Sequence, residues 1–322
     1  AAMSRIFGIG PGSRVLALGP LYHSLPDTAS KLGLELADLL VIQRKFDPEV
    51  TLRQIETHGI TELTLVPTMF VRLLKLPRAV RERYDISSLR TVTHTGAPCP
   101  PDVKRAMIDW WGPIFHELYG ATEVGVTFFA DSADWQRKPG TVGRPMTGTT
   151  FAILDEQGAP VAPGVPGEIF AWNRIAPDWE YIGHDRPARA DGLTSVGDIG
   201  YVDQDGYLFL CDRKNDMIIS GGVNIYPAEI EAVVLGHPAV LDCAVFGAPH
   251  VEMGEQIVLA VALVDGARVD ANDLRQFVRE RMADYKVPRL VDFHASLPRQ
   301  ESGKILRRTL REPYWKNSQS RI

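Results

Sequence analysis

A lysine near the end of the chain stands where it could act on a reacting group. The segment Glu301-Ser302-Gly303-Lys304 places a long, flexible cation just after a Ser-Gly turn, in a basic stretch that could open a short helix. Such a cation can be positioned on a negative charge that develops during a reaction. Taken alone, the same lysine also fits a solvated surface group, so its interpretation depends on the rest of the sequence.

A second segment combines the groups that a nucleotide phosphate requires. Tyr119-Gly120-Ala121-Thr122-Glu123 directly follows an apolar run that is typical of a strand. It offers an aromatic face, a glycine that permits close backbone approach, a hydroxyl, and a carboxylate for bound Mg²⁺. A strand-end turn that leads into an N-capped helix would explain the same five residues.

Two further segments contain glycines beside polar groups. Asp198, in Ser-Val-Gly-Asp-Ile-Gly, lies in an expected turn and has two carboxylate oxygens that can accept hydrogen bonds from the vicinal hydroxyls of a ribose. An Asx turn is the alternative. Further on, Gly221 and Gly222 offer bare backbone along which a thin pantetheine arm could pass, and Pro227 predicts a helix start. The glycine pair also fits an ordinary tight turn.

In this order the segments resemble the C-terminal two thirds of the adenylate-forming (AMP-binding) enzymes of the acyl-CoA synthetase superfamily. The resemblance covers essentially all 322 residues, and its most specific part runs over 206–231. Val196 departs from the family's usual threonine, and Asn215 stands at a hinge position that often carries Asp or Lys. The family's Ser/Thr/Gly-rich phosphate loop has no counterpart, because the glycines at 8–12 come without hydroxyls or a lysine.

The resemblance implies a role for each of these residues. Lys304 would support adenylation, whereas Gly221 and Gly222 would line the thiol tunnel after rotation about a hinge at Asn215. Nucleotide contacts would come from Gly96, Ala97, Tyr119, Gly120, the catalytic Thr122 on the α-phosphate, the catalytic Glu123 on Mg²⁺, and Asp198 and Arg213 on the ribose. His23 and Phe128 would lie near the acyl pocket, although a buried histidine and ordinary aromatic packing explain them equally well.

Composition is that of an ordinary globular protein. The chain is 45% hydrophobic and 23% charged, and its net charge of −5 argues against a nucleic-acid partner. No apolar stretch is long enough for a transmembrane segment. The three cysteines lack metal-ligand spacing, so we expect them to be reduced in a cytoplasmic protein. A homodimer is the assembly that we consider. The start Ala-Ala-Met shows no signal peptide and fits a start inside a longer protein.

Alternating strands and helices predict a layered α/β domain in the first part of the chain. Short apolar runs with Gly- and Pro-rich turns over 140–207 predict a β subdomain. The expected strands cover 16–18, 63–66, 91–95 and 114–118, and the expected helices cover 28–40, 50–58 and 101–110.

A polar cluster at 212–215 separates this domain from a second pattern. The chain then continues with strands expected over 239–246, 257–263 and 290–293 and helices over 228–235 and 272–282, which predicts a compact α+β domain. The expected organisation is the C-terminal part of a large α/β domain over 1–211, a hinge at 212–215, and a small mobile domain over 216–322.

The predicted function is an ATP-dependent acid–CoA ligase that uses ATP, Mg²⁺ and CoA on a small-molecule carboxylic acid. Segments at 19–24, 66–77 and 313–315 resemble bacterial ligases for bile, steroid or long-chain acids, which favours a bulky hydrophobic substrate. An adenylation enzyme that loads a carrier protein would share nearly every motif. An inactive fragment or scaffold is the other alternative, and without the phosphate loop the chain alone is expected to be incomplete for adenylation.

Overall fold

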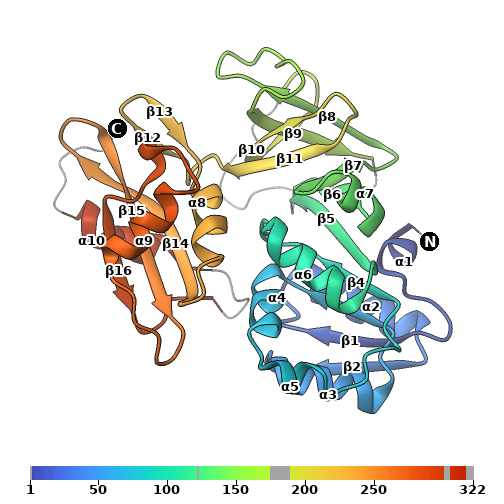
Figure 1. The fold of residues 1–322 in the computed structure, drawn as a ribbon. Helices are drawn as coiled ribbons and strands as arrows, with labels where there is room; N and C mark the ends of the chain where they lie inside the picture. Colours follow the sequence, from blue (N-terminus) through green and yellow to red (C-terminus); the bar gives the residue numbers. More distant parts are fainter. Residues whose placement is uncertain (1, 122, 175–188, 301–304, 317–322) are drawn as a thin grey trace. The chain divides into compact units, whose positions relative to one another are not determined.

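The structure, a computed structural model, describes residues 2–121, 123–174, 189–300 and 305–316. The chain divides into two compact units (Figure 1). The first unit comprises 1–196 and 200–210, and the second comprises 197–199 and 211–322. None of the helices in the described part of the chain has the length and apolar character that spanning a membrane requires.

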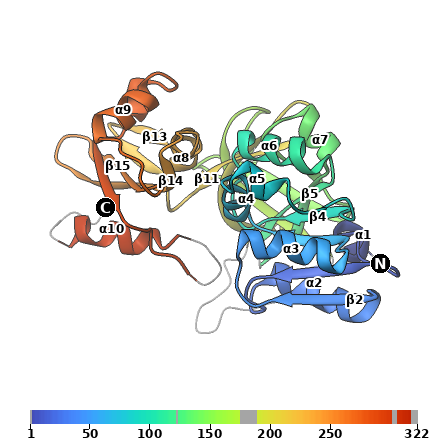
Figure 2. The ribbon, with the colours of Figure 1, turned by 60° about the horizontal axis from the view of Figure 1, so that its bottom comes forward.

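The first unit begins with a parallel sheet that has helices on both faces (Figure 2). Its strand order is β2-β1-β3-β4-β5, and one core lies between this sheet and α3, α4 and α6, while a second lies under α1 and α2. The strands are β1 (Arg14–Leu18), β2 (Leu39–Gln43), β3 (Glu62–Leu65), β4 (Thr91–His94) and β5 (Phe115–Ala121). The helices are α1 (Ala2–Phe7), α2 (Ser24–Leu36), α3 (Pro48–His58), α4 (Pro67–Leu74), α5 (Arg78–Arg81) and α6 (Pro101–Trp111).

The sheet continues beyond β5 in the order β6-β7-β11-β10-β9-β8, and the pairs β5–β6, β6–β7, β7–β11 and β8–β9 are antiparallel. Their apolar residues enclose a separate core that includes Phe128, Ile169 and Leu208. This is the predicted β subdomain. Its elements are β6 (Gly125–Ala130), α7 (Ser132–Arg137), β7 (Thr141–Pro145), β8 (Thr149–Leu154), β9 (Gly167–Asn173), β10 (Thr194–Val202) and β11 (Leu208–Arg213).

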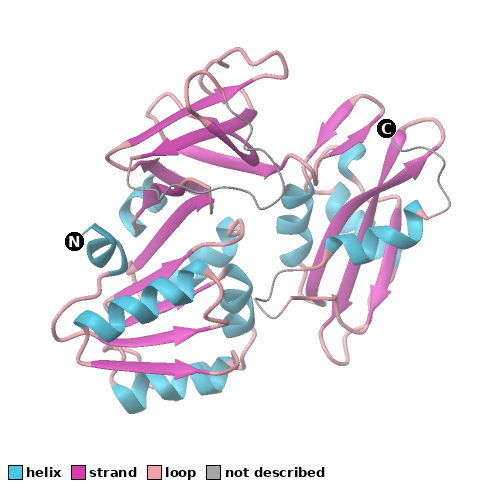
Figure 3. Ribbon diagram, turned by 180° about the vertical axis from the view of Figure 1, so that it is seen from behind, coloured by secondary structure: helices cyan, strands magenta, loops and turns pink. Residues whose placement is uncertain are grey.

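The second unit is built on a five-stranded sheet (Figure 3). Helices α8 and α9 cover the core on one face, and α10 covers the core on the other. Its elements are β12 (Ile218–Ser220), β13 (Val223–Ile225), α8 (Pro227–Leu235), β14 (Val240–His250), β15 (Gly254–Leu263), α9 (Ala271–Arg279), a short 3₁₀ helix (Asp284–Lys286), β16 (Leu290–His294) and α10 (Arg307–Trp315).

The layered α/β architecture with a β subdomain and a small α+β domain is confirmed, but some local predictions are wrong. The helix expected over 28–40 ends at Leu36, and residues 39–43 form β2, because this apolar, β-branched run pairs in parallel with β1. The strand expected to end at 118 continues to Ala121, because its last residues pair with β6. Tyr119, Gly120 and Ala121 are therefore strand residues and not a turn.

One arginine ties distant parts of the second unit together. Arg307, the first residue of α10, donates to Asp216 at 2.8 Å and to both carboxylate oxygens of Glu231 on α8 at 2.6 Å. Glu231 also accepts a hydrogen bond from the backbone N–H of Val245 on β14 at 2.7 Å. Charge-assisted, forked contacts of this kind fix orientation as well as adding stability.

Replacing Arg307 with glutamine should therefore loosen the second unit, since Asp216 and Glu231 lose a shared cation. We expect Arg307→Gln to lower the free energy of opening of β14 and β15 by about 2 kcal/mol, measured by native-state hydrogen exchange of the full-length protein. The matched control is Arg308→Gln at the neighbouring exposed position, which should change this value by less than about 0.5 kcal/mol. Equal effects of the two variants would contradict the assignment.

Candidate functional site

The predicted adenine loops lie at the ends of two neighbouring parallel strands. β4 leads into Gly96, which has φ +90°, a left-handed conformation that favours glycine. Thr95 donates its hydroxyl to the carbonyl oxygen of Leu118 on β5 at 2.6 Å, so the two strand ends are joined directly. The carboxyl ends of adjacent parallel strands are where α/β sheets bind ligands, which agrees with the expected position of a nucleotide.

Tyr119 and Gly120, the predicted site residues of β5, are more closely packed than the sequence predicts. The side chain of Tyr119 is only 6% exposed, with its ring centroid 6.0 Å from that of Phe128. Gly120 is required by close packing, because a Cβ built there would lie 2.0 Å from the carbonyl oxygen of Gly125. Ala97 is exposed, Glu123 is partly buried, and Thr122 lies outside the described residues.

The carboxylate of Glu123 is suited to a magnesium ion that binds together with nucleotide phosphates. Within the described ranges there is no cluster of three or more His, Cys, Asp or Glu side chains that could hold a metal. Mg²⁺ commonly binds through one or two carboxylates together with substrate phosphates and water. A single carboxylate such as Glu123 is consistent with that mode.

The two predicted ribose ligands are brought together. Asp198 and Arg213 are fifteen positions apart in sequence, and the guanidinium Nε lies 3.0 Å from a carboxylate oxygen of Asp198. The prediction that Asp198 lies in a turn is wrong, since it lies within β10 and is 7% exposed. Gly197 does adopt φ +72°, whereas Gly200 is required because a Cβ would lie 2.5 Å from the Phe209 carbonyl oxygen.

The glycine pair forms the turn of the β12–β13 hairpin. Gly221 and Gly222 have φ values of +58° and +77°, which confirms the tight turn and explains why both are glycine. Gly221 donates its backbone N–H to the carbonyl oxygen of Met253 at 2.8 Å, and a Cβ on Gly221 would approach the Met253 methyl group at 2.6 Å. A Cβ on Gly222 would meet nothing within 4 Å. Bare backbone is therefore exposed at Gly222.

The predicted hinge at 212–215 begins with a buried carboxylate whose capping role the sequence did not predict. Asp212 is 6% exposed and accepts hydrogen bonds from the backbone N–H groups of Arg213 at 2.7 Å and Ala228 at 2.8 Å. The bond from Ala228 makes Asp212 a remote cap of α8, and Tyr226 at the N-cap position makes no side-chain cap of its own. Asn215 is exposed in the turn that follows. The uncapped Tyr-Pro start of α8 was the signal that a remote cap was needed.

The two residues predicted near an acyl pocket, Phe128 and His23, lie in different local surroundings. Phe128 has no exposed side chain and packs between Tyr119 and Phe151, so core packing explains it and its role in a pocket stays a prediction. His23 occupies the N-cap position of α2, with its ring 4.5 Å from that of Tyr22. Its Nε2 is buried without a hydrogen-bond partner among the described residues. Lys304 lies outside the described residues.

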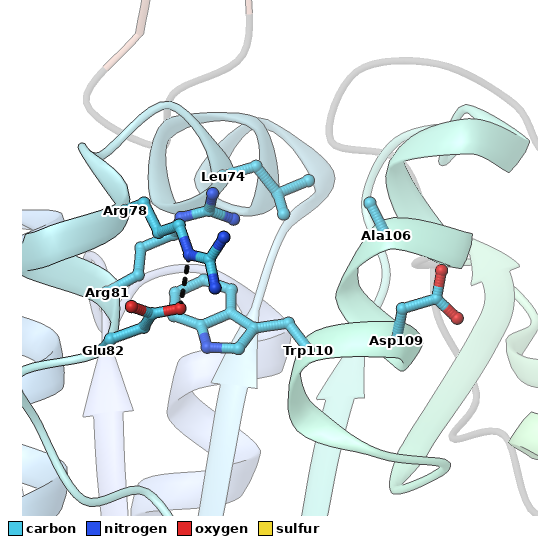
Figure 4. Close-up of a pocket in the computed structure, with 7 residues that line it drawn as sticks. All are labelled: Leu74, Arg78, Arg81, Glu82, Ala106, Asp109 and Trp110. Carbon is cyan, nitrogen blue, oxygen red and sulfur yellow. Dashed lines mark hydrogen bonds and ion pairs between the residues drawn. The ribbon is translucent and has the colours of Figure 1, made fainter.

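None of these residues lines a surface pocket of about 390 Å³ in the first unit (Figure 4). Its cations are already engaged, since Arg78 donates to Glu82 at 2.6 Å and Arg81 lies over the Trp110 ring at 5.3 Å. The lining residues come from α4, α6 and the segment around α5: Leu74, Arg78, Arg81, Glu82, Ala106, Asp109 and Trp110. We therefore assign this pocket no part in the candidate site.

Models of two known protein families match this chain, one in each unit. The model of the AMP-binding enzyme family matches residues 1–174, and the model of the AMP-binding enzyme C-terminal domain matches residues 229–304. The chain belongs to the AMP-binding enzyme family. The residues described above thus lie in an AMP-binding enzyme, as the sequence resemblance implied.

Individual members of the AMP-binding enzyme family are similar over almost the whole chain. A long-chain-fatty-acid–CoA ligase of Bacillus subtilis is 35% identical over 94% of this chain and 55% of its own length. A feruloyl-CoA synthase of Amycolatopsis is 37% identical over 94% of this chain and 62% of its own length. The crystal structure of ATP-bound MatB from Rhodopseudomonas palustris superposes with a TM-score of 0.83 at 30% identity, covering 98% of this chain and 62% of that one. The chain therefore spans about 55–62% of the length of these relatives.

The remote cap predicts a titration that can be observed directly. Burial raises the pKa of Asp212 to about 6, although its backbone hydrogen bonds oppose the shift. An unfolded aspartate titrates near about 3.9, so protonation favours the fold, and stability from this group falls as pH rises from about 4 to about 6. The amide ¹⁵N shift of Ala228 in the full-length protein should titrate with a midpoint near 6 and lose this step in Asp212→Asn.

The amide of Ser87 is the matched internal control. It donates to Asp85, whose pKa is lowered by this backbone hydrogen bond, so its shift should stay flat from pH 5 to 8. An Ala228 amide that also stays flat over this range would contradict the raised pKa of Asp212.

Proposed function

We propose that the protein is an ATP-dependent acid–CoA ligase that forms an acyl-adenylate first and a CoA thioester second. The observation that carries this proposal is the 3.0 Å pairing of Asp198 with Arg213 in a chain of the AMP-binding enzyme family. Two groups suited to ribose hydroxyls, fifteen positions apart in sequence, meet at one place. Relatives that are 35% and 37% identical bear the names of acid–CoA ligases, which supports CoA as the acceptor.

In the first half-reaction the substrates are a carboxylate and ATP. The loop at Gly96 and Ala97 and the ring of Tyr119 would hold adenine, and Asp198 and Arg213 would hold the ribose. The acid's oxygen attacks the α-phosphorus, the bond to the bridging oxygen breaks, and pyrophosphate leaves. Mg²⁺ near Glu123 would neutralise phosphate charge, with Thr122 on the α-phosphate. Lys304 would donate to the reacting oxygens, where a fixed cation stabilises developing charge.

In the second half-reaction the acceptor is the CoA thiolate. It attacks the acyl carbon, the bond to the phosphate oxygen breaks, and AMP leaves. The exposed backbone at Gly222, in the turn shared with Gly221, supports passage of a pantetheine arm at this hairpin. We propose that the protein changes from the first half-reaction to the second by rotation about 212–215, where Asn215 lies in an exposed turn. The domains on either side of this hinge would be 1–211 and 216–322. Cytoplasmic location and a homodimer remain predictions.

The two assigned roles separate experimentally in the full-length protein. Lys304→Ala should slow acid-dependent ATP–pyrophosphate exchange by about two orders of magnitude while leaving CoA attack on a supplied acyl-adenylate nearly unchanged. Gly222→Leu should do the opposite, because a side chain there obstructs the path of the thiol without touching the nucleotide residues. Each half-reaction is measured by rapid quench.

Each variant has a matched control in the same unit. Gly266→Leu places the same side chain at φ +78°, also with nothing within 4 Å of its Cβ, and so reproduces the backbone strain of Gly222 at φ +77° away from the hairpin. Lys316→Ala removes an exposed lysine from the end of α10. Both controls should retain both half-reactions. Equal loss of the two steps in Lys304→Ala would show that this lysine serves folding and not adenylation.

The substrate and the acceptor are tested together. The full-length protein should release AMP faster with palmitate or a steroid acid than with acetate, since the local resemblances favour a bulky hydrophobic acid. AMP release measured with CoA, with a carrier protein and with neither separates a CoA ligase from a carrier-loading enzyme. A clear acetate preference would refute the substrate class, and no AMP release with any acid would favour the scaffold alternative.

A further inference from the structure

A fully buried lysine of the first unit pairs with a buried glutamate, and both lie outside the residues assigned above. Lys104 on α6 has no exposed surface, and its Nζ lies 2.6 Å from a carboxylate oxygen of Glu117 on β5, which is 5% exposed. His94, the last residue of β4, is also fully buried, with its Nε2 3.7 Å from the same oxygen. Neither ring nitrogen of His94 has a hydrogen-bond partner among the described residues.

The surroundings of this ion pair are apolar and aromatic. Lys104 lies 5.6 Å from the centroid of the Trp135 ring, and Phe70 meets His94 edge-on at 5.1 Å. Burial raises the pKa of Glu117 and the ammonium of Lys104 counteracts this, while burial and the same ammonium hold the pKa of His94 well below its usual range. A histidine whose pKa is held low therefore lies beside a buried ion pair.

Stability alone does not explain such a pair. Desolvation of two charges offsets most of their attraction, and well-packed apolar residues of similar volume are often as stable or more so. What a short charge-assisted hydrogen bond adds is a fixed distance and direction between two elements. Apolar contacts between a helix and a sheet tolerate sliding that this bond does not.

The elements joined by the pair are those that carry the predicted adenine contacts. Glu117 precedes Tyr119 by two residues, and side chains two apart on a strand share a face. Lys104 lies at the end of the first turn of α6, and the chain that enters this helix is the loop containing Gly96 and Ala97. The pair thus links α6, which follows the Gly96-Ala97 loop, to β5, which carries Tyr119.

We propose that the Lys104–Glu117 ion pair is a positioning device that fixes the separation between the Gly96-Ala97 loop and Tyr119 and so sets the affinity for the adenine nucleotide. Neither residue touches the nucleotide, and each acts through the element that it holds. This inference rests on the proposed nucleotide-binding function of the same unit.

The test replaces the pair with apolar residues, so that stability and positioning can be separated. In the full-length protein, Lys104→Met alone leaves a buried carboxylate unpaired and should lower the Tm. The double variant Lys104→Met/Glu117→Leu should recover most of the lost Tm, yet its KM for ATP and its Kd for AMP by calorimetry should stay raised by about tenfold, with a smaller change in kcat. A double variant with wild-type Tm and wild-type AMP affinity would overturn the inference.

A second variant keeps the test decisive if the double variant does not fold. Glu117→Gln retains the shape and a hydrogen bond to Lys104 but removes one charge, and it should raise the KM for ATP by at least about threefold, with the KM for CoA unchanged. An unchanged KM for ATP in Glu117→Gln would overturn the inference.

A control and the wild-type protein separate the remaining outcomes. Met107→Leu alters a fully buried residue of the same helix without charge, and should leave the KM for ATP unchanged. A KM for ATP raised as much by Met107→Leu as by Glu117→Gln would show general sensitivity of α6 and also overturn the inference. A wild-type protein that binds no AMP refutes the proposed function itself, whereas AMP binding that is equal in the wild type and the double variant refutes only the role of the pair.

Discussion

Strand β5 is the element on which the first unit depends, because parallel pairing on one side of the strand meets antiparallel pairing on the other. It pairs in parallel with β4 and antiparallel with β6, so the helix-covered layer and the β subdomain share one continuous sheet. The approach of the β5–β6 pair is so close that Gly120 has no room for a Cβ. Every side chain on this strand inherits its position from both neighbours, which suits a strand that carries a ligand contact.

Buried or partly buried carboxylates repeat this principle across the chain, since each holds a partner from a distant element. Glu117 holds Lys104 of α6, Asp212 holds the first turn of α8, and Glu231 holds Arg307 of α10. A carboxylate offers two acceptor oxygens, so it can orient donors that apolar packing would leave free to slide. Asp212 is the first residue of the predicted hinge, and Glu231 lies on α8, which follows the glycine hairpin.

The candidate site residues fall into two sets, each described within its own unit. One set, at the ends of β4 and β5, is suited to an adenine ring. The other set contains the Asp198–Arg213 pair and the hairpin with Gly221 and Gly222, both in the second unit. In the proposed adenylation, the adenine set and the Asp198–Arg213 pair would hold the same nucleotide, whereas the hairpin would serve the proposed thioester formation.

The motifs of the sequence indicated the family through their resemblance to it. The sequence also determined the fold class and the turn at Gly221-Gly222, because hydrophobic period, proline at helix starts and adjacent glycines are local signals. It failed where a partner distant in the chain decides the outcome. Residues 39–43 form a strand because β1 lies beside them, and Asp198 lies in a strand because β10 has neighbours on both sides. The Lys104–Glu117 pair and the cap of α8 by Asp212 were decided only by the tertiary structure, since burial and the approach of a donor to a carboxylate exist only once the chain has folded.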